Sequence, residues 1–179
     1  ITTCRNPIIQ RSFQTLIDTL NAQIKEIEAQ IEQLFTTSSA LQTQRTCLVS
    51  IQGIGGTTAA KLLGEMYDLD QYENAPAAAA DAGATPTHYE SGTSVRRRPR
   101  MSKMGKASVR GALYWPAITA MHHNPVIRRL KDRLEQKGKP FKVIVGAAIR
   151  KLLHLAYGVL KHQTLFEPEY VQKIHQKHA

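Results

Sequence analysis

Apolar residues near the N-terminus recur in steps of three and four. They are Ile17, Leu20, Ile24, Ile27, Ile31 and Leu34. This alternation is typical of the seam of a coiled coil. Polar side chains fill the other faces, so we predict a long helix over residues 1–45, with a seam interrupted at Ser38, that pairs with a second copy of the chain. The alternative is one amphipathic helix that packs against its own domain.

A glycine-rich segment, GIGG, follows this helix. Two short helices, one ending near Ile51 and one starting near Thr57, are predicted to flank it. Glycine allows positive φ and exposes successive backbone N–H groups, and the start of the next helix adds partial positive charge. Such a corner binds a phosphate without reading the base sequence. The predicted phosphate-binding residues are Gly53, Gly55, Gly56 and Thr57. The segment resembles a helix-hairpin-helix motif, and the alternative is a plain corner between two helices.

Helix caps predict two further helices. Asn74 is placed to cap a helix over residues 76–82, with Gly83 as its end. Asn124 precedes a proline and an apolar repeat, which predicts a second helix that ends at Gly138. Asparagine at the start and glycine just past the end are the residues that helix termini favour.

The pattern between these helices is less regular. Residues 84–102 show neither a helical nor a strand period, so we predict an exposed basic loop there. A helical pattern resumes near Ser102 or Lys103, with a kink expected at Pro116. The last long helix is predicted to start at Pro140.

No segment is convincing as a strand, so the predicted fold is mainly α. We expect a coiled-coil helix over residues 1–45, a helical domain with the helix-hairpin-helix-like motif over residues 46–166, and a polar tail over residues 167–179. The unbroken apolar runs are short and no signal segment is evident, which predicts a cytoplasmic protein without a membrane span. Cys4 and Cys47 are too few and too far apart for a structural zinc site or a disulfide framework.

Positive charge is concentrated in one part of the chain. Lys and Arg number 24 against 14 Asp and Glu, a net charge of +10. This balance favours a polyanionic partner, either nucleic acid or an acidic membrane surface, although it also serves solubility. No acidic residue lies between Glu90 and Asp132, which predicts a nucleic-acid footprint there. The predicted DNA- and phosphate-binding residues are Arg96, Arg97, Arg98, Arg100, Lys103, Lys106 and Arg110, and Arg128, Arg129 and Lys131 complete the run.

Ser91 directly precedes this basic run. Arginines hold phosphate oxygens bidentately and offset the charge that builds up when a phosphodiester is attacked. A serine placed among them can act as a nucleophile. Basic loops more often bind phosphate than cut it, so spacing alone favours binding over catalysis, and both readings stay open at this point.

Four segments carry a resemblance to a known family. In chain order they are SIQGIGGTTAAKLLGEM, YESGTSVR, MSKMGKASVRGALYWPA and KVIVGAAIRKLLHLAYGVLK. Together they resemble the C-terminal domain of insertion-sequence transposases that have an N-terminal Asp-Glu-Asp-Asp catalytic domain. That family is related to the Piv-type DNA invertases and includes bridge-RNA-guided recombinases. The resemblance covers residues 12–166, and the chain departs from the family pattern at Asp81, Thr87 and Gly111.

The resemblance implies DNA transposition or site-specific recombination. In the family, the serine of the SG pair joins covalently to DNA, and the matching residue is Ser91. The family's Mg²⁺ ligands lie in an RNase H-like domain that precedes the coiled coil, so we expect no metal or cofactor in this chain. Implied partners are DNA, a guide RNA and further copies of the chain. Because the chain begins at Ile1 and not at Met, we expect a fragment that is inactive alone. The alternative is a non-catalytic DNA- or RNA-binding module left from a truncated element.

Overall fold

The computed structural model describes residues 6–66, 69, 71–91, 95–102 and 104–169, without the side chains of residues 88–91 and 95–100. The chain divides into two compact units, residues 1–42 and 43–179. The described residues are mainly helical, as the sequence predicts. Lys103 and the tail beyond residue 169 lie outside the described residues.

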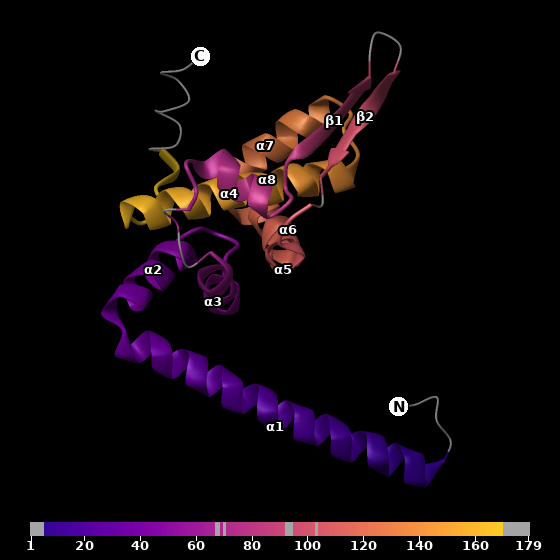
Figure 1. Cartoon of the computed structure of the whole chain (residues 1–179), viewed down its shortest axis with the longest axis vertical. Coiled ribbons are helices and arrows are strands. Elements are labelled where there is room, and N and C mark those ends of the chain that lie inside the picture. The colour runs from indigo at the N-terminus through magenta and orange to yellow at the C-terminus, as the bar shows by residue number, and fades with distance from the viewer. Residues whose placement is uncertain (1–5, 67–68, 70, 92–94, 103, 170–179) are drawn as a thin grey trace. The chain divides into compact units, whose positions relative to one another are not determined.

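The first unit contains one long helix, α1 (Pro7–Thr37). It begins where the side chain of Asn6 accepts a hydrogen bond from the Ile8 N–H at 3.0 Å, and it ends at Ser38, whose backbone is extended. Figure 1 shows α1 as one continuous rod. The six predicted seam residues are all exposed, from 36% at Ile31 to 62% at Leu34. No residue from 6 to 42 therefore covers the apolar seam.

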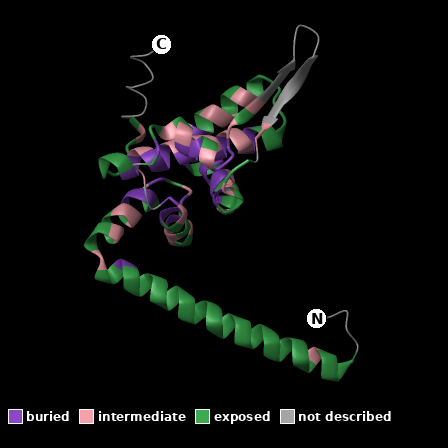
Figure 2. Ribbon diagram, in the orientation of Figure 1, coloured by how far each residue is buried: buried purple, intermediate pink, exposed green. Residues whose placement is uncertain are grey.

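The second unit contains the other elements. They are α2 (Ser39–Val49, which begins in the first unit), α3 (Gly56–Glu65), α4 (Ala75–Asp81), β1 (Pro86–Ser91), β2 (Val95–Met101), α5 (Ala107–Ala112), α6 (Tyr114–His123), α7 (Pro125–Gln136) and α8 (Phe141–His162). Helices α4, α6 and α7 pack against α8, and α3 packs against α5 (Figure 1). Figure 2 shows the buried residues gathered around α8. Apolar residues occupy most of the circumference of α8, which explains its central position.

Helix α8 is unusually long and apolar. Among the described residues it is the one helix long and apolar enough to cross a membrane by length and composition. However, 61% of its most apolar window is buried inside the fold. Burial against α4, α6 and α7 accounts for this apolar composition.

The predicted helix caps are confirmed. The side chain of Asn74 accepts from the Ala77 N–H at 2.9 Å and starts α4. Asn124, which is fully buried, accepts from the N–H of Val126 at 3.0 Å and starts α7. Gly83 and Gly138 have φ of +64° and +63° just past the ends of these helices. Each of these caps acts through neighbours in sequence, so the sequence pattern was sufficient to find it.

Two other predictions were wrong. The segment predicted as a loop over residues 84–102 contains an antiparallel hairpin, β1 and β2. The helix expected from Ser102 or Lys103 begins only at Ala107, and a break at Leu113 separates α5 from α6 where a kink was expected. Pro116 explains the break, because proline has no N–H and clashes with the carbonyl four residues earlier.

The pH dependence of stability is expected to involve His154, in α8. Burial, with the nearby charges of Arg150 and Lys151, lowers its pKa to about 4. Its Nε2 is buried and has no hydrogen-bond partner among the residues that the structure describes. In the unfolded chain this imidazole binds a proton when the pH falls below its ordinary pKa of about 6.5. In the folded protein it stays neutral until the pH approaches 4. The stabilisation is therefore present above about pH 6.5 and is lost as the pH falls toward 4.

The free energy of unfolding of the wild type should fall between pH 7 and pH 4.5, and in His154→Leu this fall should be smaller by roughly 1–3 kcal/mol. That figure is the contribution of a pKa shift of this size, reduced because His154 is partly exposed. Urea unfolding at the two pH values measures this loss. His122→Leu, at an exposed position of α6, is the control and should leave it unchanged. Equal acid sensitivity of the wild type and His154→Leu would contradict the assignment.

Candidate nucleic-acid interface

The loop between α2 and α3 is fastened at several points. Ile54 is buried, and a Cβ on Gly53, whose φ is +108°, would lie 2.8 Å from both the Pro116 carbonyl oxygen and the Ala120 Cβ. Gly53 is therefore required for close packing against α6. The amide of Asn124 also donates to the Gln52 carbonyl at 3.4 Å. The loop is held to the starts of α6 and α7, so its exposed part has a defined position.

The start of α3 faces solvent. Gly55 precedes the helix, is exposed, and supplies no capping side chain. Thr57 is exposed as well. The N–H groups of a helix's first turn have no partner within the helix and carry partial positive charge, so they suit an anion. α2 ends at Val49 and α3 begins at Gly56, close to the helix ends that the sequence predicts, while phosphate binding at this corner stays a prediction.

Arg45 adds a positive charge at this corner, and it is not among the predicted phosphate-binding residues. A Cβ on Gly56 would lie 2.9 Å from Nη2 of Arg45, so the guanidinium of this α2 residue lies beside the start of α3. Arg45 is half-buried. It stands eleven positions before Gly56 in the sequence, outside the basic run, and no local pattern relates the two residues.

The hairpin brings Ser91 and the predicted arginines onto one two-stranded ribbon. In its register, Ser91 pairs with Val95, Glu90 with Arg96, and Tyr89 with Arg97. Thr87 pairs with Arg100 beyond an irregularity in the ladder. Ser91 thus ends β1 directly opposite the start of the basic strand β2, which carries Arg96, Arg97, Arg98 and Arg100. Their side chains, and the connecting residues 92–94, lie outside the described part of the chain.

The base of the ribbon is joined to α4 and α5 by hydrogen bonds. The Ser102 N–H donates to the Thr85 carbonyl at 2.8 Å, and the Lys106 N–H donates to the Asp81 carbonyl at 2.8 Å. Gly105 has φ of +116°, and a Cβ there would lie only 1.9 Å from the Asp81 carbonyl oxygen. Only glycine permits this approach. The chain therefore enters and leaves the ribbon at one tightly closed point.

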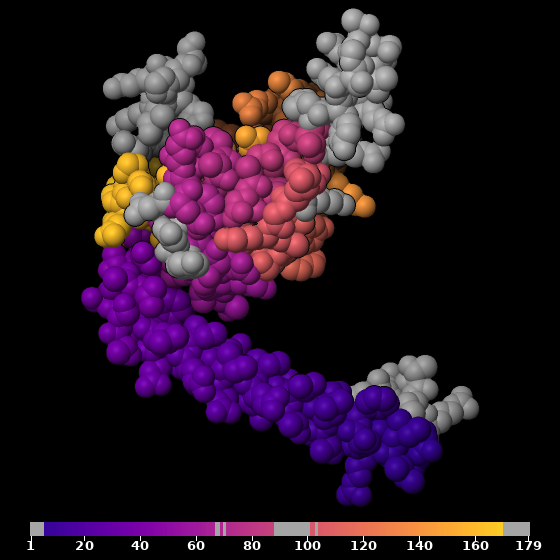
Figure 3. Space-filling view, viewed as in Figure 1, coloured from indigo at the N-terminus to yellow at the C-terminus, as the bar shows by residue number. Residues whose placement is uncertain are grey.

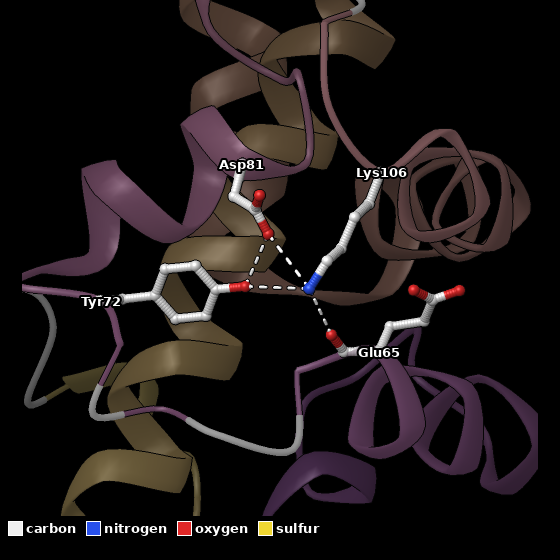
Figure 4. Close-up of polar contacts among 4 residues, drawn as sticks. All are labelled: Glu65, Tyr72, Asp81 and Lys106. Carbon is white, nitrogen blue, oxygen red and sulfur yellow. Dashed lines mark hydrogen bonds and ion pairs between the residues drawn. The ribbon is translucent and has the colours of Figure 1, made fainter.

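A polar cluster reinforces this closure (Figure 4). Lys106 Nζ donates to the Glu65 carbonyl at 2.7 Å and lies 3.3 Å from Asp81 Oδ2, while Tyr72 OH donates to Asp81 Oδ2 at 2.6 Å. Burial alone would lower the pKa of Lys106, but its hydrogen bonds to Tyr72 and Asp81 raise it. Burial and the Asp81 hydrogen bond raise the pKa of Tyr72. The Lys106 ammonium thus joins the ends of α3 and α4 to the start of α5.

Arg110, another predicted phosphate ligand, also makes a contact within the fold. Its Nη1 donates to the Ala82 carbonyl at 2.7 Å, at the end of α4. Lys106 and Arg110 therefore both stabilise the base of the ribbon, and phosphate binding by either stays a prediction. In Figure 3, α5 lies at the surface of the second unit, beside α3 and α4.

The described residues offer no obvious metal site. No three His, Cys, Asp or Glu side chains come together in the described part of the chain in a way that could hold a metal ion. The Asp81 carboxylate is engaged with Tyr72 and Lys106. Mg²⁺ prefers clustered oxygen ligands, and the family resemblance places such a set in a domain outside this chain.

Comparison with known proteins gives a consistent set of relatives. Residues 45–132 match the sequence model of the Transposase IS116/IS110/IS902 family. The pilin gene-inverting protein of Moraxella bovis is 33% identical over 145 residues, which cover 80% of this chain and 45% of that protein. The insertion element IS110 43.6 kDa protein of Streptomyces coelicolor is 26% identical over 160 residues, 89% of this chain and 38% of that protein. The chain spans less than half the length of each of these relatives.

Proposed function

We propose that this chain, which carries a domain of the Transposase IS116/IS110/IS902 family, is the DNA-binding and nucleophile-bearing part of a DNA recombinase. The observation that supports this most strongly is the similarity to a pilin gene-inverting protein over 80% of the chain. The similar region includes the serine–arginine ribbon and the exposed start of α3. Phosphate contacts from Gly55, Gly56 and Thr57 would hold DNA without reading its sequence.

In the proposed reaction Ser91 is the nucleophile. Its Oγ attacks a DNA phosphorus and forms a phosphoserine bond as one P–O bond to deoxyribose breaks. A general base takes the serine proton, and the leaving deoxyribose oxygen gains a proton from a general acid. Attack of a second DNA hydroxyl on the phosphoserine reverses these steps and rejoins the strands. The arginines of β2 would hold the phosphate oxygens and offset the charge that builds up during attack. Mg²⁺ would bind in a part of the recombinase outside this chain.

The alternative function is nucleic-acid binding without chemistry, and we expect it to describe this chain when it is studied alone. A serine hydroxyl is a weak nucleophile unless another group activates it. Basic strands and an uncapped helix start suffice for binding. A guide RNA as a further partner remains a proposal from the family resemblance.

DNA binding should depend steeply on salt. Each phosphate contact releases counterions, so removing one contact should reduce the slope of log affinity against log salt by about one. We expect this reduction for Arg96→Ala and for Arg98→Ala, measured by fluorescence anisotropy with a random-sequence duplex. Lys25→Ala, in α1, is the charge-matched control and should leave the slope unchanged. Affinity that does not vary with salt, or no binding at low salt, would reject the proposed function.

Self-association through α1 is a second expectation, because its apolar seam is exposed from Ile17 to Leu34. Ile24→Lys with Ile31→Lys places charge in the seam and should convert any oligomer to a monomer in sedimentation experiments. Ala22→Lys with Ala29→Lys adds the same charge on the opposite face of the helix. This control pair should keep the oligomer. An unchanged mass after the seam substitutions would show that α1 does not join the copies.

A further inference from the structure

An aromatic pair stands exposed at the start of α6. Trp115, the single tryptophan, is 71% exposed and Tyr114 is 43% exposed. Their ring centroids are 5.4 Å apart and the ring planes meet at 82°. Large aromatic side chains are usually well buried, so an exposed pair in contact differs from the isolated apolar residues common on surfaces. Neither ring is used by the ribbon or by the closure at its base.

The backbone beneath the pair is firmly held. Leu113 before it and Pro116 and Ala117 after it are buried. Pro116 also lies in close contact with Gly53 of the α2–α3 loop. Because this backbone is rigid, the aromatic side chains lose little conformational freedom when a flat ligand stacks on them.

The surroundings favour a ligand with phosphates. The contact between Gly53 and Pro116 brings the α2–α3 loop to the start of α6, and the exposed start of α3 follows Gly53 by only three residues. Helix α3 also packs against α5, which leads directly into α6. The sequence from residue 91 to residue 131 contains no acidic residue that would repel a polyanion. The aromatic pair and the exposed start of α3 thus lie on segments that contact each other.

We propose that Trp115, with Tyr114 at its edge, is a stacking platform for an unpaired nucleobase, while the start of α3 holds a neighbouring phosphate. Combining stacking with phosphate contacts is a general way to hold single-stranded nucleic acid. Paired bases in a duplex keep their faces covered by their neighbours, so the platform selects strands that are open or distorted. This inference rests on the proposed nucleic-acid binding and adds the kind of strand that is bound.

Because Trp115 is the single tryptophan, its fluorescence reports on the platform directly. The whole chain is titrated with oligodeoxythymidine, oligouridine, a duplex of equal length, and polyphosphate. We expect quenching by single strands and little by the duplex or polyphosphate. Quenching by both single strands supports recognition through the base, and quenching by one of them supports the platform and shows that the sugar or the 5-methyl group of the base affects binding. Equal quenching by polyphosphate, or none by either strand, would overturn the proposal.

Variants test the same point through labelled oligonucleotides. Trp115→Ala should weaken single-strand binding by about 5- to 100-fold, the usual contribution of one stacked base, and change duplex binding less than about twofold. Trp115→Phe should retain most of the affinity. Phe141→Ala removes another exposed ring, at the start of α8, and should change neither affinity. An equal loss for single strand and duplex would contradict a base-stacking role.

Two outcomes separate this inference from the function on which it rests. If the duplex binds with the expected salt dependence while Trp115→Ala leaves single-strand binding unchanged, the platform is wrong and the proposed function stands. If no nucleic acid binds at low salt, the proposed function itself fails. A fluorescence change on raising the protein concentration without nucleic acid would assign Trp115 to contact between copies of the chain, against the proposal.

Discussion

Gly105→Ala is expected to lower the free energy of unfolding of the second unit by about 3 kcal/mol or more. The new Cβ would lie 1.9 Å from the Asp81 carbonyl oxygen, and φ at this position is +116°. Relief of the clash would separate the end of α4 from the start of α5. That movement would break the hydrogen bond from the Lys106 N–H to Asp81 and disturb the side-chain cluster beside it.

Thermal unfolding measures this effect, with an expected fall in Tm of about 6–12 °C for a domain of this size. Gly158→Ala is the matched control, because Gly158 lies within α8 and a Cβ there meets no atom within 4 Å. It should leave stability unchanged or raise it by about 0.5–1 kcal/mol, since alanine favours helix. Similar Tm values for the two variants would show that the ribbon base is not closed as described.

The sequence predicts the helices well where the deciding interactions are local. Asn74 and Asn124 cap helices through amides two or three residues away. No strand was predicted here because a two-stranded ribbon need not bury one face, and its sequence therefore requires no alternation of apolar and polar residues. Pro99 within β2 is also an unfavourable residue for a strand interior, although proline is tolerated at a sheet edge. Ser91 and the arginines of the basic run therefore lie on a hairpin where a loop was predicted, and their roles stay predictions.

Interactions across long sequence separations leave no local pattern in the sequence. Lys106 was selected for its charge within a basic run. Its ammonium instead reaches the Glu65 carbonyl, 41 residues away, and the carboxylate of Asp81. Gly53 was selected as a phosphate ligand, yet its close packing on Pro116 is what requires a glycine. Such contacts depend on how the helices pack, and no periodicity along the chain encodes them.

Ser91→Ala should abolish covalent attachment to DNA in the full-length recombinase proposed above. The substitution removes the proposed nucleophile and no charge, so DNA affinity should change less than about twofold. Ser102 is the control. Its Oγ accepts a hydrogen bond from the Met104 N–H at 3.3 Å, and it lies before α5, which begins at Ala107. Ser102→Ala should therefore keep the attachment. This chain alone, without the rest of the recombinase, should form none.

The identity of the attached residue is the most direct test of the proposed function. The full-length recombinase would be incubated with DNA and Mg²⁺, denatured, digested with nuclease and protease, and its peptides analysed by mass spectrometry. We expect a nucleotide joined through a phosphate to Ser91, present in the wild type and in Ser102→Ala and absent from Ser91→Ala. A nucleotide on Ser94, Ser102 or any other residue, or recombination that proceeds without an adduct, would contradict the assignment of Ser91 as the nucleophile.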